Sequence, residues 1–133
     1  NSFEGFKFSH ASIMHNALKM KQLSKIVSVG IRDISHAEIE VIKHSKNRIK
    51  AFFDTEIKEK VQIRQTETWH SLCRKIVEEL PKNVYISFDI DGLDPKLCPH
   101  TGTPVQGGFE TEQIFYLFKK NFMELPILWK TLS

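Results

Sequence analysis

The sequence predicts an α/β fold, in which helices connect the strands of a parallel sheet. Segments with the apolar spacing of helices alternate along the 133 residues with short apolar runs rich in β-branched residues. One such run, residues 84–90, is apolar at most positions, as a strand covered on both faces must be. Strands separated by helices imply crossover connections. The chain carries no internal repeat or low-complexity linker, so we expect a single domain over residues 1–133 with no internal boundary.

The first half of the chain predicts two helices and two strands. Apolar residues recur at helical spacing over residues 13–20, and a β-branched run at residues 25–31 follows as a strand. Ser35 and Glu38 form a capping-box pattern, in which a hydroxyl and a carboxylate each satisfy an unpaired backbone N–H at a helix start. Residues 48–53 are the second predicted strand.

The second half predicts two more helices around one strand. The polar run at residues 54–67 indicates a loop or an irregular crossover, and residues 69–80 follow the rhythm of an amphipathic helix that ends before a proline. The apolar strand at 84–90 comes next. Residues 92–108 hold four of the six glycines and indicate a long structured loop, after which the apolar spacing of residues 114–122 predicts a last helix.

Composition excludes some classes of function. Nineteen Lys and Arg against sixteen Asp and Glu give a net charge of +3 that is spread along the chain, so no nucleic-acid role is indicated. No apolar stretch reaches the ~18 residues of a membrane span. Cys73 and Cys98 are too far apart for a Cys-x-x-Cys pair and too few for a disulfide framework. We expect two plain thiols and a cytoplasmic protein.

The segment at residues 87–108 carries most of the candidate chemistry. Asp89 and Asp91 lie two apart at the end of a predicted strand, which would direct both side chains to one face at the sheet edge where α/β folds bind ligands. Carboxylates this close repel each other, and a hard divalent cation between them keeps both ionised. Two solvated acids in a turn are the plainer alternative, and Asp94 is either a turn cap or a further ligand. The Asp-x-Asp spacing alone leaves both interpretations open.

The longer pattern resembles a known family. An apolar strand, Asp-x-Asp-x-x-Asp-Pro, Thr-Gly-Thr-Pro at 101–104 and Gly107-Gly108 follow in an order that resembles the C-terminal metal-binding signature of ureohydrolases, the arginases, agmatinases and their relatives. Upstream, Gly-Ile-Arg-Asp at 30–33 resembles a stretch that follows a strand in arginases, and Ser-His-Ala-Ser at 9–12 stands where the family has a His-Gly segment. The resemblance covers essentially the whole chain, as the middle and later part of that domain.

The resemblance implies a fold, a cofactor and a reaction. The fold is a three-layer α/β/α arrangement around a parallel sheet, arginase-like and incomplete in this chain, with two manganese ions at the carboxyl edge of the strands. Asp89 would bridge both ions and Asp91 would bind one. A water held between two cations has a lowered pKa and attacks the guanidinium carbon, releasing urea, while His10 would pass a proton to the departing amine. We expect a small guanidino substrate, no nucleic-acid or membrane partner, and a homo-oligomer.

The chain also departs from the family pattern. The Gly-Gly-Asp-His and Asp-Ala-His-x-Asp motifs that supply the other metal ligands are absent from residues 1–133, and so is the later Glu that grips the guanidinium. Two aspartates alone cannot hold two manganese ions. We therefore expect either a fragment of an enzyme or a truncated, non-catalytic domain of the same fold. A nucleotide-sugar site built on Asp-x-Asp is a third interpretation, which the Thr-Gly-Thr-Pro loop disfavours.

The resemblance also places Asp33 and Ser35 next to the substrate. Ser35 stands where arginases carry an acid for the α-amino group of arginine, so agmatine or a guanidino acid stays open as the substrate. Of the other histidines, only His100 is close to the signature loop, and a surface or packing role is the default for each of them. The aromatic residues of the last two predicted helices fit apolar helix faces and are expected in the core: Trp69, Phe115, Phe118 and Phe122.

Overall fold

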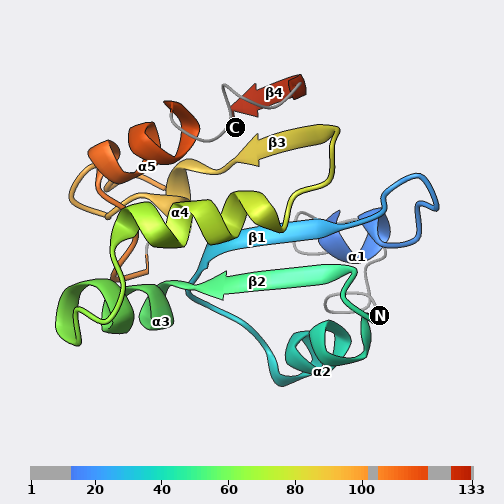
Figure 1. Cartoon of the computed structure of the whole chain (residues 1–133), viewed down its shortest axis with the longest axis horizontal. Helices are drawn as coiled ribbons and strands as arrows, with labels where there is room; N and C mark the ends of the chain where they lie inside the picture. The colour runs from blue at the N-terminus through green and yellow to red at the C-terminus, as the bar shows by residue number, and fades with distance from the viewer. Residues whose placement is uncertain (1–12, 102–104, 120–126, 133) are drawn as a thin grey trace.

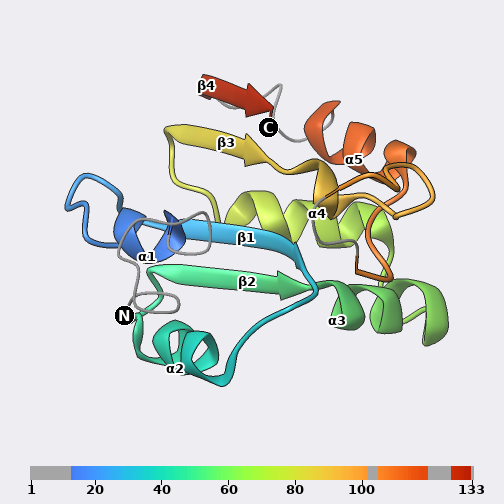
Figure 2. The same cartoon turned by 180° about the vertical axis from the view of Figure 1, so that it is seen from behind.

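Four strands, paired in parallel as two two-stranded sheets, form the centre of the described part of the protein. The structure is a computed structural model that describes residues 13–101, 105–119 and 127–132. Strand β1 (Ile26–Ile31) pairs in parallel with β2 (Ile49–Phe53), and β3 (Val84–Phe88) pairs in parallel with β4 (Ile127–Leu132). All four strands point the same way in both views (Figures 1 and 2), so their carboxyl ends lie on one side of the molecule. The α/β fold and the parallel pairing are as predicted.

Strand β1 contains an irregularity that brings it close to a loop. Its register with β2 shifts between Val29 and Ile31, and the residue between them, Gly30, has φ +80°. A Cβ at Gly30 would lie 2.3 Å from the ring of Phe109. A side chain here would therefore be strained by its backbone and would collide with the core, which explains why the β-branched run is broken by glycine.

The predicted helices form, and α1 and α4 end two or three residues earlier than predicted. Helix α1 covers Ile13–Ala17, α2 covers His36–His44, α4 covers Trp69–Glu78 and α5 covers Thr111–Leu117. The capping box at the start of α2 is confirmed, because the Ser35 hydroxyl accepts the Glu38 N–H at 3.3 Å and the Glu38 carboxylate accepts the Ser35 N–H at 2.8 Å. None of the described helices is long and apolar enough to cross a membrane.

The prediction of a loop over residues 54–67 is wrong for most of that segment. It forms helix α3 (Asp54–Lys58) and a π-helical turn, η2 (Glu59–Ile63). Ion pairs one turn apart support the polar helix, with 3.0 Å between Asp54 and Lys58 and 3.8 Å between Glu56 and Lys60. Ile57 is 4% exposed and anchors the helix to the core. Only Ile57 and Val61 in this segment pack against the core, and two apolar residues one turn apart are too weak a pattern to indicate a helix in sequence.

The core lies between the strands and helices α4 and α5. Seven buried side chains form it: Ile57, Leu72, Cys73, Ile76, Phe109, Ile114 and Leu117. Trp69 packs on Phe109 and Phe118 packs on Phe88, as predicted for the aromatic residues of these helices. Phe115 is an exception, because it is 66% exposed and faces away from the core, and Phe122 lies outside the described residues.

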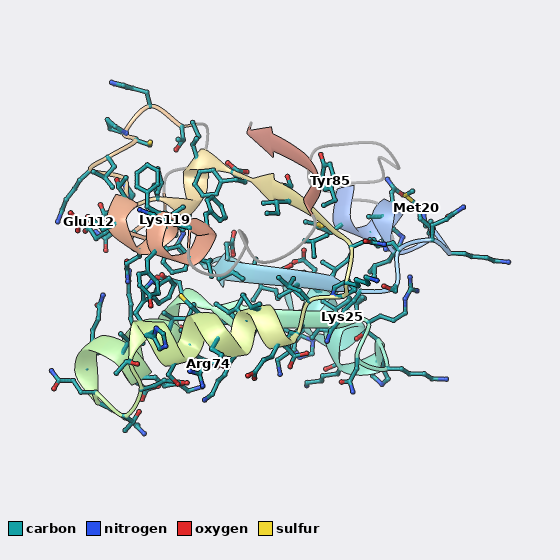
Figure 3. The ribbon with its side chains drawn as sticks, turned by 45° about the horizontal axis from the view of Figure 1, so that its top comes forward. Met20, Lys25, Arg74, Tyr85, Glu112 and Lys119 are labelled. Carbon is teal, nitrogen blue, oxygen red and sulfur yellow. The ribbon has the colours of Figure 1, made fainter. Side chains whose placement is uncertain are left out.

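Strand β3 has one covered face and one open face. Ile86 and Phe88 pack against the core, whereas Tyr85 is 61% exposed and points away from α4 (Figure 3). This alternation is typical of a strand covered on one face. It differs from the predicted strand covered on both faces, because the alternate residues Tyr85 and Ser87 are exposed.

Candidate metal centre

Each of three strands is followed at its carboxyl end by a charged residue. Arg32 comes directly after β1, Asp54 directly after β2 and Asp89 directly after β3. Because the strands point the same way, their carboxyl ends lie on the same side of the two strand pairs (Figure 1). Parallel sheets bind ligands at this edge, where the strand backbones end and loops begin.

Asp89 and Asp91 belong to a turn and not to the strand itself. The strand was predicted to continue to Ile90, but β3 ends at Phe88 and a 3₁₀ turn covers Ile90–Gly92. Asp89 is the N-cap of this turn, and its Oδ1 accepts the N–H of Asp91 at 3.0 Å. The alternation of side chains along a strand is therefore the wrong reason for placing the two acids together. The capped turn holds them together instead.

The Asp91 carboxylate contains a buried oxygen that needs a partner. Its Oδ1 has less than 1 Å² of exposed surface and no hydrogen-bond donor among the described residues. Leaving such an atom unpaired costs about 1–3 kcal/mol, more when it is charged. A hard divalent cation binds carboxylate oxygens and would remove that cost. The buried Asp91 oxygen thus fits a divalent cation, and Asp89 lies in the same turn.

The remaining ligands of a two-metal site are not found in the described part of the chain. Among residues 13–101, 105–119 and 127–132, no three His, Cys, Asp or Glu side chains are placed to hold one metal ion. His10, the candidate proton shuttle, lies outside the described residues. The assignment of Asp89 and Asp91 as metal donors therefore stays a prediction, and a metal site built on them would need further ligands.

The two candidate substrate-binding residues lie on the connection from β1 to α2. Asp33 is exposed, and the Ser35 hydroxyl donates to the Glu38 carboxylate at 2.7 Å as part of the helix cap. Asp94 also has a local role, since its Oδ1 accepts the N–H of Lys96 at 2.9 Å. Of the two interpretations open for Asp94, the structure supports the turn cap. The roles of Asp33 and Ser35 towards a substrate stay predictions.

Two glycines let the end of the signature loop pack tightly. Gly107 and Gly108 have φ of +101° and +97°. A Cβ on Gly108 would lie 2.5 Å from the Leu93 carbonyl, and one on Gly107 would lie 2.6 Å from Asp54 Oδ2. Backbone hydrogen bonds from Phe109 N–H to Gly92 O and from Asp94 N–H to Phe109 O, both 3.0 Å, join the two ends of the loop. The glycines serve a tight loop, as the sequence indicates.

The structure adds contacts for two residues, Arg32 and Asp54, to which the sequence patterns gave no role. Arg32 donates hydrogen bonds to the carbonyl oxygens of Asp91 and Val105, which lie 59 and 73 residues away in the chain. Asp54, only 3% exposed, pairs with Lys58 and accepts the Gly108 N–H at 3.4 Å. The one sequence signal for Asp54 is its place directly after a predicted strand. That signal was hidden by the polar run that follows it.

Comparison with known proteins identifies the family. A sequence model of the Arginase family matches residues 1–127. The chain belongs to the arginase family. It is 39% identical to Arginase-1 of Bos taurus over 95 residues, which are 69% of this chain and 27% of that protein. It is 31% identical to the N(1)-aminopropylagmatine ureohydrolase of Thermus thermophilus over 126 residues, which are 95% of this chain and 39% of that protein.

Solved structures support the same fold. Proclavaminate amidino hydrolase from Streptomyces clavuligerus superposes with a TM-score of 0.75 at 22% identity, over 98% of this chain and 41% of that one. An arginase from Medicago truncatula gives 0.74 at 22% identity, over 100% and 38%. The arginase-family chain thus has the predicted fold and spans well under half the length of the relatives it matches.

Proposed function

We propose that this chain contributes to a ureohydrolase, an enzyme that hydrolyses a guanidino C–N bond and releases urea with manganese as its cofactor. The observation that carries the proposal is the capped turn at the end of β3, in which Asp89 Oδ1 accepts the Asp91 N–H and the Asp91 Oδ1 is buried without a partner among the described residues. Membership of the arginase family supports it, and so do the names of the relatives, which are arginases and ureohydrolases. The same turn lies at the sheet edge where such folds bind ligands.

We assign different steps of the proposed reaction to different residues. Asp89 and Asp91 would hold the manganese, which when bound supplies a water of lowered pKa as the nucleophile. Water adds to the guanidinium carbon, the bond from that carbon to the substrate nitrogen breaks, and the departing amine takes a proton. We assign that proton transfer to His10, because the pKa of an imidazole lies near neutral pH.

The substrate class we propose is a small guanidino compound. Ser35 is uncharged and its hydroxyl is engaged with Glu38, so this position offers no charge to an α-amino group. Agmatine or a guanidino acid therefore fits this position better than arginine does. Arginine stays in the set to be tested, because Asp33, on the same connection, carries an exposed carboxylate.

We further propose a cytoplasmic homo-oligomer. Large apolar side chains on several elements are exposed, among them Ile63 at 76%, Phe115 at 66% and Tyr85 at 61%. Apolar surface of this kind favours contact with more protein, from a second copy or from further parts of an arginase-fold domain. Cys73 and Cys98 are both free thiols, as suits a reducing compartment.

A non-catalytic domain of the same fold is the second candidate. The observation that favours it is the lack of any three-ligand metal group among the described residues. Such a domain would keep the fold and the capped turn but hold manganese weakly or not at all.

Urea release decides between the two candidates. The whole gene product that carries residues 1–133 is purified and incubated with arginine, agmatine or 4-guanidinobutyrate, with and without added manganese. We expect urea from at least one substrate, and only with manganese. Absence of urea from all three, together with no bound manganese, would favour the non-catalytic domain.

A further inference from the structure

Three charged side chains converge on the loop that follows the candidate metal-binding turn. Arg32 extends from the end of β1, and Asp54 and Lys58 lie one turn apart on α3. We call these three residues the loop clamp. None of them belongs to the Asp-x-Asp turn, and they come from two different strand ends.

The Arg32 guanidinium joins the two ends of the loop. One of its nitrogens donates to the Asp91 carbonyl and the other donates to the Val105 carbonyl. A planar guanidinium can make two such bonds in fixed directions, which a lysine ammonium cannot reproduce. Arg32 therefore restrains the peptide unit of Asp91, whose carboxylate is a proposed metal ligand.

Asp54 restrains the same loop from the α3 side. Its Oδ2 lies 3.0 Å from Lys58 Nζ and 3.4 Å from the Gly108 nitrogen, while its buried Oδ1 has no partner among the described residues. Burying a carboxylate is costly unless ion pairs and hydrogen bonds offset the lost hydration. A carboxylate that is 3% exposed and only partly satisfied is hard to explain as a contribution to stability alone.

All three residues of the clamp meet at Gly107. A Cβ there would lie 2.6 Å from Asp54 Oδ2, 2.9 Å from Lys58 Nζ and 3.5 Å from Arg32 Cδ. The glycine thus lets the loop backbone approach three charged side chains at once. This close packing restricts the loop to one position relative to the strand ends.

We propose that Arg32, Asp54 and Lys58 are positioning residues that hold the 105–108 segment and, through the Asp91 carbonyl, set the direction of the Asp91 carboxylate. The part of this inference that concerns metal rests on the proposed function. Groups that orient metal ligands change metal affinity by about 10- to 100-fold when they are removed. The clamp should therefore act on the affinity for manganese and on the protection of the loop, without contacting a substrate.

Substitutions in α3 separate the clamp from an ordinary surface ion pair. Asp54→Asn keeps the size of the side chain but removes its negative charge. That charge pairs with Lys58 Nζ and faces the Gly108 N–H. Glu56→Gln is the matched control, since it makes the same change on the same helix in an exposed pair with Lys60. Arg32→Lys is a second test variant, which keeps the positive charge but loses the two-carbonyl geometry, and it serves if Asp54→Asn does not fold.

Two measurements are made on the whole gene product that carries this chain. Hydrogen exchange without metal follows the amides of residues 105–109, and calorimetry with Mn²⁺ alone gives the dissociation constant. We expect Asp54→Asn and Arg32→Lys to speed exchange in this segment and to weaken Mn²⁺ binding about tenfold. Glu56→Gln should change neither.

The outcomes are distinguishable. Exchange that stays slow in both clamp variants would overturn the clamp. Faster exchange with an unchanged dissociation constant would overturn its role in positioning Asp91. A wild-type protein that binds no Mn²⁺ would overturn the proposed function and the metal part of this inference, while the exchange of the metal-free loop would still show whether the clamp holds it.

Discussion

Charged side chains at the two ends of the parallel strands differ in how completely they are paired. At the amino end, Lys25 and Lys50 both pair with Glu79, which follows the last residue of α4; Figure 3 shows Lys25 beside the end of that helix. At the carboxyl end, Asp54 and Asp91 each have a buried oxygen without a partner among the described residues. The amino end is arranged for stability. The carboxyl end keeps unsatisfied groups, which is typical of a site that awaits a ligand.

The carboxyl end is also where the backbone departs from regular structure. Gly30, Gly107 and Gly108 all have positive φ and all approach this region or the core beneath it. Residues other than glycine are disfavoured at these positions, because any side chain would be strained or would collide. The proposed site and the constrained backbone therefore lie in the same segment.

The largest effect should come from removing the charge at Asp89. In Asp89→Asn the amide oxygen can still accept the Asp91 N–H, so the turn is retained, but the negative charge that offsets repulsion between cations is lost. We expect loss of one or both metal ions and of most ureohydrolase activity. Elemental analysis checks the metal content, with Glu40→Gln on the exposed side of α2 as the control. Wild-type metal content in Asp89→Asn would contradict the assignment.

Substitution of His10 should have the next largest effect and should separate proton transfer from metal binding. We expect His10→Ala to lower turnover by roughly 10²-fold, the typical contribution of a general acid. Its manganese content should stay near that of the wild type. Steady-state kinetics across pH, combined with elemental analysis, tests this. Unchanged turnover at every pH would mean that His10 has no part in the reaction.

Local patterns predicted most of the fold, and non-local contacts account for the misses. The capping box of Ser35 and Glu38 depends on residues three apart, so it is visible in sequence. Strand β4 was not predicted, because its main support is pairing with β3, about forty residues earlier in the chain. The end of β3 was misplaced because the Asp89 side chain caps a turn in competition with the strand.

The candidate site was predictable to a similar extent. Asp89 and Asp91 could be proposed as metal ligands because they lie within one continuous signature, and that role stays a prediction. Arg32 and Asp54 reach that signature from 54 or more residues away, and nothing in their local sequence shows what they contact. Charged residues that contact a loop from distant parts of the chain are therefore harder to predict than residues within the loop.

The two cysteines allow the signature loop to be compared with the core, because one lies in each. Cys73 is fully buried in α4, and burial raises the pKa of its thiol to about 12, whereas Cys98 lies half-buried in the signature loop. Because the thiolate is the reactive form, we expect Cys98 to react with iodoacetamide at least about tenfold faster than Cys73. Mass spectrometry of the native protein, with the single variants Cys73→Ser and Cys98→Ser to assign the sites, measures this. Equal rates would show that the core around α4 opens readily.

The smallest effect concerns the ion pairs at the amino end. The hydrogen bond from Lys25, with the nearby positive charge of Lys50, lowers the pKa of Glu79 in the folded protein. Its contribution to stability is therefore fully present above the ordinary glutamate pKa of about 4.3 and is lost as the pH falls through the lower, folded value. We expect Glu79→Gln to lower the free energy of unfolding by less than about 1 kcal/mol at pH 7, since the side chain is one-third exposed and solvent screens the pair.

Denaturant unfolding at pH 7 and at pH 3 measures this contribution. The difference between wild type and Glu79→Gln should shrink at pH 3, because below the ordinary glutamate pKa the unfolded state takes up a proton and the contribution begins to be lost. Glu78→Gln, the same change one residue earlier at an exposed position without an ion pair among the described residues, is the control and should show no such dependence. A Glu79 effect that is as large at pH 3 as at pH 7 would mean that the side chain stabilises the amino end by packing and not by charge.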